Sequence, residues 1–215
     1  VIASTERGRL DQIFSQMQRL QQVVANAKIV EDACHAPAEQ RAVMLPELER
    51  WLRDVLLCNP DLSMAYVADA KGVCFVSTSP EMLGIDVSAQ RRYMRRALNG
   101  ENAISNLTRR STAADRGVFF AGPVMDHGNR VTGVVAIELK GQVIDDVCRE
   151  ITGQMAKGIA MVIDQNGVII SHPDEEKRYL SLENISTEAL SWFDPKFLYG
   201  VDRIDSIGQK GLSRA

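Results

Sequence analysis

The first part of the chain carries hydrophobic residues at alternating intervals of three and four positions, separated mostly by glutamine and other polar residues. This spacing places the hydrophobic side chains on one face of an α-helix. We therefore expect a long helix over residues 10–27, whose hydrophobic face packs either against the rest of the chain or against a second copy of the chain. The residues of this face are Leu10, Ile13, Met17, Leu20, Val24 and Ala27.

A second helix is predicted over residues 46–57, where hydrophobic residues again recur at helical spacing. Pro46 suits the first turn of a helix, in which an amide hydrogen is not needed. Asn59 and Pro60 come directly after this segment. They predict its end, because proline rarely continues a helix.

Two later segments, residues 65–77 and 160–171, share a pattern of strand, tight turn and strand. Each turn begins with an aspartate, Asp69 or Asp164, and has a glycine three positions later. An aspartate can accept hydrogen bonds from amides within such a turn, and glycine adopts the left-handed conformation without steric penalty. We therefore interpret both aspartates as turn residues and not as catalytic carboxylates. The repetition of the pattern indicates two copies of one small module.

The segment between the two hairpins is predicted to form a helix, three strands and a second helix, with polar turns between the strands. A hairpin, a helix and three sequential strands favour an antiparallel sheet with helices packed against it. The fold class is therefore expected to be α+β. The first helix covers residues 91–98, the strands cover residues 103–108, 118–124 and 131–139, and the second helix covers residues 142–151.

The composition is that of an ordinary globular protein, with 215 residues of which 45% are hydrophobic. The net charge of -3 provides no general attraction for a phosphate backbone, so nucleic acid is not an expected partner. Uncharged stretches such as residues 131–137 are much shorter than the roughly 20 residues that span a bilayer. Because the chain begins with Val1 and shows no signal peptide, we expect a processed or excised fragment.

Signatures of metal binding and of catalysis are missing from the sequence. The four cysteines form no CxxC pair and the three histidines lie far apart, so we expect no metal site. The cysteines are interpreted as buried thiols, although one disulfide would be compatible with an oxidising compartment. Since the nucleophile elbow, the phosphate loop and the dinucleotide fingerprint are all absent, we expect no catalytic residues and no cofactor.

The order of these segments resembles the extracytoplasmic double Cache sensor domain of bacterial receptors, in which two PAS-like modules follow a long N-terminal helix. The resemblance covers almost the whole chain. The second half, residues 163–173 and 178–182, looks most like the dicarboxylate sensor histidine kinases. In the first half the resemblance rests on residues 66–72, 84–88, 91–93, 122–124 and 133–137.

The resemblance implies an α+β fold with the long N-terminal helix followed by two modules, each an antiparallel sheet with flanking helices. Residues 1–60 would form the two N-terminal helices. Residues 61–150 would form the membrane-distal module, which binds the ligand. Residues 151–215 would form a membrane-proximal module that is short for the family.

In this family a carboxylate-binding arginine falls on Arg91, and its aromatic partner falls on Tyr93. A guanidinium can hold a carboxylate with two parallel, charge-assisted hydrogen bonds, and an aromatic wall excludes water around them. Thr108 and Phe120 are further expected ligand contacts. From the residues alone, however, Arg91 could equally belong to a solvated helix face and Tyr93 to the hydrophobic core.

Two further expected site residues, Glu138 and Arg110, bear on the kind of ligand. The dicarboxylate sensors carry a lysine at the position of Glu138, whereas relatives that bind amino acids place an acid there to meet the ligand's ammonium group. Arg110 falls near a position where the amino-acid binders carry another acid, so the full amino-acid motif is not present. The ligand class therefore stays open between an organic acid and an amino acid, and Glu138 could also be an ordinary surface or salt-bridged residue.

We expect a ligand-sensing domain in the bacterial periplasm, anchored in the inner membrane and paired as a homodimer through the N-terminal helix. A sensor histidine kinase is the favoured parent protein. A diguanylate cyclase or a chemoreceptor could carry the same sensor. A non-signalling binding or oligomerisation module is the alternative from a different functional class.

Overall fold

The computed structural model describes residues 2–89, 91–109, 116–190, 193 and 195–208, and it divides into two compact units. The sheet unit comprises Asp11–Ser105 and Val118–Leu139. The terminal unit comprises Val1–Leu10, Asn106–Gly117 and Lys140–Ala215. These units do not follow the expected boundaries at residues 60 and 150, because the helix that follows the last long strand groups with the C-terminal part of the chain.

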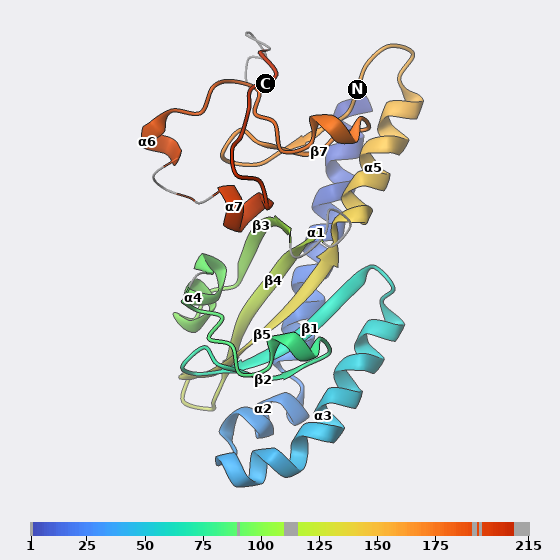
Figure 1. Ribbon diagram of the computed structural model, residues 1–215. Helices are drawn as coiled ribbons and strands as arrows, with labels where there is room; N and C mark the ends of the chain where they lie inside the picture. The colour runs from blue at the N-terminus through green and yellow to red at the C-terminus, as the bar shows by residue number, and fades with distance from the viewer. Residues whose placement is uncertain (1, 90, 110–115, 191–192, 194, 209–215) are drawn as a thin grey trace. The chain divides into compact units, whose positions relative to one another are not determined.

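A five-stranded sheet forms the centre of the sheet unit, with the strand order β2-β1-β5-β4-β3 (Figure 1). β1 pairs antiparallel with both β2 and β5. This arrangement, with helices around it, confirms the expected α+β fold. The strands are β1 (Leu62–Asp69), β2 (Cys74–Ser77), β3 (Ala103–Arg109), β4 (Arg116–Met125) and β5 (Val131–Lys140).

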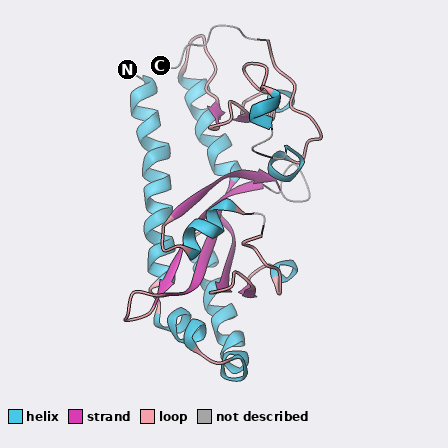
Figure 2. Ribbon diagram, turned by 90° about the vertical axis from the view of Figure 1, so that its left-hand side faces the viewer, coloured by secondary structure: helices cyan, strands magenta, loops and turns pink. Residues whose placement is uncertain are grey.

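Three helices precede the sheet: α1 (Ile2–Ala25), α2 (Lys28–His35) and α3 (Ala38–Cys58). α1 runs beside the sheet, as Figure 2 shows, and Phe14 contacts the ring of Phe120 edge to face at 5.4 Å. Met17 and Val24 of α1 are almost completely buried within the same unit. The hydrophobic face of the predicted helix therefore packs against its own chain.

The helix predicted from residue 46 begins eight residues earlier, at Ala38, so Pro46 lies inside α3 and not in its first turn. A proline inside a helix removes one backbone hydrogen bond. Here Leu48 and Leu52, both completely buried, hold the helix against the sheet beyond the proline. The end of the helix was predicted correctly, since Asn59 forms the C-cap and donates from its side chain to the carbonyl of Val55.

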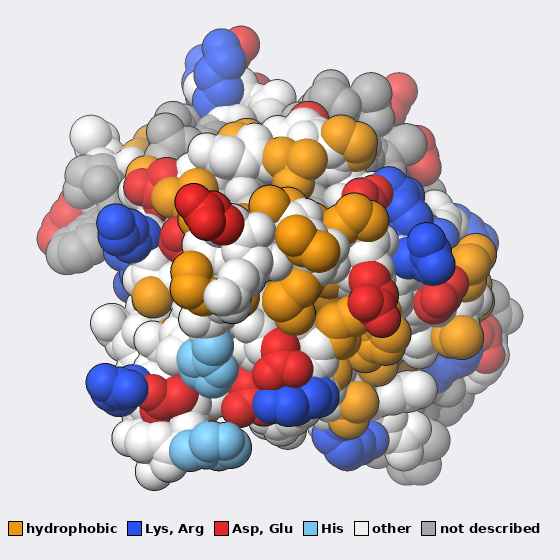
Figure 3. Space-filling view, turned by 90° about the horizontal axis from the view of Figure 1, so that it is seen from below, with side chains coloured by type: hydrophobic (Ala, Val, Ile, Leu, Met, Phe, Trp, Pro, Cys, Tyr) orange, Lys and Arg blue, Asp and Glu red, His pale blue; other side chains and the backbone are white. Residues whose placement is uncertain are grey.

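α2 was not predicted from the sequence. It is only eight residues long, and three of them, Val30, Ala33 and Cys34, are buried. A short helix gives too few turns for its hydrophobic spacing to stand out. Seen from below (Figure 3), hydrophobic side chains form a band on the end of the molecule where α2 and α3 lie. Val43 of α3 contributes to this exposed surface with 81% of its area accessible.

The two predicted hairpin turns have the same hydrogen bonds. The carboxylate of Asp69 accepts from the amides of Lys71 and Val73. The carboxylate of Asp164 accepts from the equivalent amides two and four residues later. Gly72 and its counterpart Gly167 both adopt positive φ, at 86° and 79°. Both aspartates thus stabilise the backbone of a turn, as the sequence indicated.

The correspondence continues beyond the turns at the same spacing. The amide of Cys74 donates to the carbonyl of Ile85, and ninety-five residues later the amide of Ile169 donates to the carbonyl of Leu180. α4 (Arg92–Leu98) and α6 (Thr187–Leu190) begin at equivalent positions. Because this register holds without a gap, Ser186 occupies the position in the second copy that Arg91 occupies in the first.

The terminal unit contains a two-stranded sheet and a buried ion-pair network. Arg116 forms an ion pair with Asp145 of α5, and both residues are 5% exposed. Arg116 also donates to the carbonyl of Ile170 at 2.6 Å, and the hydroxyl of Ser171 donates to Asp145 at 2.5 Å. The network therefore ties α5 to β7. The elements are α5 (Gly141–Gln154), β6 (Val162–Ile163), β7 (Ile169–Ser171) and α7 (Pro195–Tyr199), with the 3-10 helices η1 (Pro80–Met82) and η2 (Glu175–Lys177) in the two copies of the repeat.

Within the described part of the chain, no helix is both long enough and apolar enough to cross a membrane. All four cysteines fall among the described residues and are free thiols; three are buried and Cys58 is exposed.

A comparison of two glycines tests the packing of the first turn. A methyl group at Gly72 would lie 2.7 Å from Cβ of Ser88, whereas one at Gly84, which also has positive φ, would meet nothing within 4 Å. Gly84→Ala is expected to lower the free energy of unfolding by ~1–2 kcal/mol through backbone strain. Gly72→Ala is expected to lose a further ~1–3 kcal/mol through the steric clash. Equal urea denaturation midpoints for the two variants would contradict this packing.

Candidate functional site

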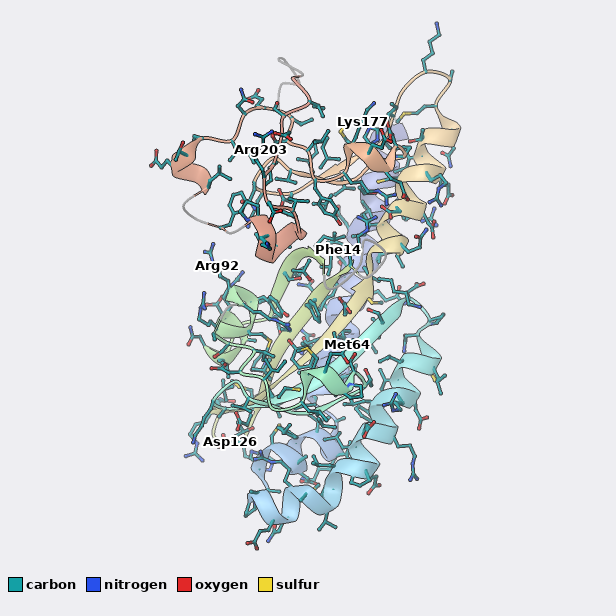
Figure 4. All side chains as sticks on the ribbon, viewed as in Figure 1. Phe14, Met64, Arg92, Asp126, Lys177 and Arg203 are labelled. Atoms are coloured by element: carbon teal, nitrogen blue, oxygen red, sulfur yellow. The ribbon has the colours of Figure 1, made fainter. Side chains whose placement is uncertain are left out.

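Arg91 is the N-cap residue of α4, and its side chain turns toward the sheet. Its guanidinium donates long hydrogen bonds to the phenol oxygens of Tyr66, at 3.5 Å, and of Tyr93, at 3.4 Å. It also lies over the ring of Phe119, 5.7 Å from the ring centroid. Arg92, labelled in Figure 4, is instead exposed. Arg91 is therefore not part of the solvated face of this helix.

Three aromatic rings surround the Arg91 guanidinium and are almost completely buried. Tyr93 stacks on Phe119 with ring centroids 5.4 Å apart and planes inclined by 10°. Tyr66 contacts Phe119 edge to face, and its phenol oxygen lies 3.2 Å from that of Tyr93. The two phenols can thus satisfy one another, and the rings exclude water from the charge beside them.

The two tyrosines do not provide a counter-charge for Arg91. Burial raises the pKa of Tyr66 well above its ordinary value, and the proximity of Tyr93 raises it further. Burial also raises the pKa of Tyr93, although Arg91 partly opposes this effect. Both phenols are therefore neutral at physiological pH. Among the residues that the structure describes, no carboxylate lies within ion-pair distance of Arg91, so a partly buried cation has only neutral partners.

Glu138 lies on β5 with its side chain completely buried. It pairs with Met64 of β1, and it shares a face of the sheet with Ala136, two positions away, which packs in the same hydrophobic cluster as Tyr66. The hydroxyl of Ser63 donates to its carboxylate at 2.6 Å. The charge of Glu138 also contributes to raising the pKa of Tyr93, so the two residues are electrostatically coupled.

Phe120 does not face this cluster, contrary to the expectation from the sequence. Its ring packs on Phe14 of α1, while its neighbour Phe119 points to the opposite face and stacks on Tyr93. Successive residues of a strand point to opposite faces, so only one of the two rings can reach Arg91. β4 is buried from Arg116 to Gly122, and a strand that is buried on both faces shows no alternation that could identify the inner ring.

Tyr66 is the other member of the cluster that was not among the expected contacts. The alternation of β1 offered a signal for it, because Met64 and Ala68 share its face and the same cluster. Of the remaining expected residues, Thr108 falls in the terminal unit and its hydroxyl donates to the carbonyl of Gly117 at 3.4 Å. Arg110 lies outside the described residues. Roles for both in ligand binding stay predictions.

The cluster can act on a ligand only by binding it. It presents a guanidinium with free hydrogen-bonding capacity, neutral phenols and, on the same sheet face, a buried carboxylate. Across the described ranges there is no group of three or more His, Cys, Asp or Glu residues placed to hold a metal ion.

Comparison with known proteins places this fold. A model of the family described as the Cache domain matches residues 2–211. The sensor domain of the V. cholerae histidine kinase DctB aligns over 96% of this chain and 78% of its own, with a TM-score of 0.78 and 17% identity. The E. coli DcuS sensor domain aligns over 65% of this chain and 96% of its own, with a TM-score of 0.52 and 17% identity.

A chemoreceptor provides a third structural relative. The ligand-binding domain of Pseudomonas fluorescens CtaA, in complex with L-alanine, aligns over 83% of this chain and 72% of its own. Its TM-score is 0.59 at 17% identity. At such identities the likeness concerns the fold. No match was found among curated proteins.

Replacing Arg91 by methionine tests whether this arginine serves stability. Arg91→Met removes a cation without a counter-charge and leaves the two phenols bonded to each other, so the free energy of unfolding should rise or stay within about 0.5 kcal/mol. Arg41, which donates to the carbonyls of Ala33 and Ala36, provides the control. Arg41→Met should lose ~1.5–3 kcal/mol in urea denaturation. A similar loss for Arg91→Met would identify it as a structural residue.

Proposed function

The chain belongs to the Cache domain family, and we propose that it is the extracytoplasmic sensor of a transmembrane receptor and binds a small carboxylate at Arg91. Cache domains are ligand-binding sensor modules of signalling proteins, among them histidine kinases and chemoreceptors. The chain is accordingly a module of signal transduction and not an enzyme.

The observation that carries this proposal is the guanidinium of Arg91 between neutral phenols. A partly buried cation without a counter-charge is unfavourable, and a carboxylate that enters the cluster removes this penalty. It can accept two parallel hydrogen bonds from the guanidinium, which are shorter and stronger than those to the phenols. The ring of Phe119 and the two tyrosines would keep water away from this pair.

We favour an α-amino acid as the ligand over a dicarboxylate. Glu138 offers a buried negative charge on the same sheet face, which would attract the ammonium group of an amino acid and repel a second carboxylate. Structures of the chemoreceptor CtaA with L-alanine, L-serine and L-valine show that a protein of this fold takes such ligands. The resemblance of the second half to the dicarboxylate sensor kinases supports the other alternative.

The first copy of the repeat is the one that we assign to ligand binding. Ser186 stands at the position of Arg91 in the second copy, and Glu188 stands at the position of Tyr93. The second copy therefore lacks both the guanidinium and the ring beside it. We assign to it the transmission of the signal toward a membrane anchor, a role for which a carboxylate site is not needed.

A sensor histidine kinase is the parent protein that we favour, because the DctB sensor domain aligns with nearly the whole chain. A diguanylate cyclase, a chemoreceptor and a non-signalling binding module are the alternatives. In the sensor reading, the ligand favours the conformation in which helix α4 and the sheet both contact it. It can shift the equilibrium only by its difference in affinity for the two conformations.

Thermal unfolding with L-alanine and with succinate tests the site and its ligand class. A ligand at about a hundredfold excess over its dissociation constant stabilises the folded state by ~2.7 kcal/mol, so a clear rise in melting temperature is expected with L-alanine. Arg91→Met should abolish the rise, whereas Arg92→Met, at the exposed neighbour, should retain it. Glu138→Gln keeps an acceptor for Ser63 and should weaken L-alanine more than succinate.

The opposite preference in these experiments would favour the dicarboxylate reading. A rise that survives Arg91→Met would place the ligand elsewhere, and the proposed role of Arg91 would be wrong.

We keep a homodimer through α1 as part of the proposal, with a change in the face that it uses. Met17 and Val24 are buried against the sheet, so the predicted hydrophobic face is occupied. Val23 is 65% exposed on the same helix and is available to a second copy. Oxidative crosslinking in membranes should give dimers for Val23→Cys in the full-length receptor. Met17→Cys is the buried control, and the same yield from both variants would contradict this interface.

A further inference from the structure

A cavity of about 210 Å³ lies where the C-terminal part of α1 meets β4 and the residue before β3. Four carboxamide side chains line it, and Pro123 and Met125 provide an apolar wall. The volume equals that of roughly seven water molecules at about 30 Å³ each. The four carboxamides belong to Gln21, Gln22, Asn26 and Asn102.

This cavity is separate from the cluster at Arg91. A side chain at Gly122 of β4 would point toward Gln21 of α1, while Phe119 of the same strand points to Tyr93. Phe120, which shares the face of Gly122, packs on α1. The cavity thus lies on the α1 side of the sheet, and Arg91 lies on the α4 side.

Gln21 is the polar group that calls for a ligand. Its side chain is 2% exposed and lines the cavity, and its amide nitrogen has no hydrogen-bond partner. A buried amide without a partner is unfavourable, and polar cavity groups of this kind are normally satisfied by a bound molecule or by water. A ligand oxygen near Gln21 would therefore stabilise the folded state.

Gly122 leaves the space in which the carboxamides meet. A methyl group there would lie 2.4 Å from the side-chain oxygen of Asn102 and 2.5 Å from the amide nitrogen of Gln21. The two carboxamides therefore converge over the bare backbone of β4. Only a residue without a side chain permits this approach, so the strand is shaped to hold both groups together.

The lining selects for a neutral ligand, because none of its residues carries a charge. A charged molecule would lose its hydration here without gaining a counter-charge. A carboxamide both donates and accepts hydrogen bonds, and so do neighbouring hydroxyl groups. We infer that the cavity is a second ligand site for a small neutral polyhydroxy compound the size of one sugar ring, and that it binds independently of the site at Arg91.

Titration with D-glucose and with myo-inositol tests this inference, with the side-chain amide signals of Gln21 and Asn102 in nitrogen-15 NMR spectra as the readout. At least one probe should shift these signals in a saturable manner. Gln21→Met retains the length of the side chain and removes the amide, and it should weaken binding by about tenfold or more. Gln16→Met changes an exposed glutamine of the same helix outside the cavity and should bind as the wild type does.

Gly122→Ala provides a second variant, since its methyl group displaces both carboxamides and should abolish the saturable shift even if Gln21→Met fails to fold. Arg91→Met separates the two sites: it should lose L-alanine and retain the polyhydroxy compound. The inference is overturned if neither probe saturates the signals, which would mean a water-filled cavity. It is equally overturned if Gln21→Met or Gly122→Ala binds with unchanged affinity.

Discussion

A sheet that is covered on both faces is the constraint on which the rest of this structure depends. α4 and η1 cover one face of the sheet, and α1 and α3 cover the other, where Phe14 contacts Phe120 and Arg41 lies over Phe75. Any polar group enclosed between these layers must find a partner there, because water has little access. The polar groups that lack a full set of partners therefore mark the places where a ligand can contribute most.

Arg91 shows how such a group can serve function at the expense of stability. Its closest partners are two phenols whose raised pKa values keep them neutral, so the guanidinium remains a charge in search of an anion. A carboxylate partner from the protein itself would have stabilised the domain and blocked the site. Leaving the charge open follows the general pattern in which binding sites are less stable than a fully satisfied core.

The two copies of the repeat differ in the side chains and agree in the backbone. The Asp turns are retained because each carboxylate holds two amides, and this geometry is needed wherever the hairpin reverses. Gly84 and its counterpart Tyr179 both adopt positive φ, although only the first is a glycine. Arg91 has been retained in one copy alone, with Ser186 in the other, so the carboxylate-binding group is specific to the first module.

The sequence by itself determined the α+β class, the duplicated hairpin and the position of the α4 helix, because turns and hydrophobic periods are local properties of the chain. It also indicated Arg91 and Tyr93, through a resemblance that rests on short motifs. Only the tertiary structure decided which of Phe119 and Phe120 faces Arg91, and that the hydrophobic face of α1 is buried within its own unit. The reason is physical: a fully buried strand has no polar face to mark its orientation, and a hydrophobic helix face has the same pattern whether the sheet or a second copy covers it.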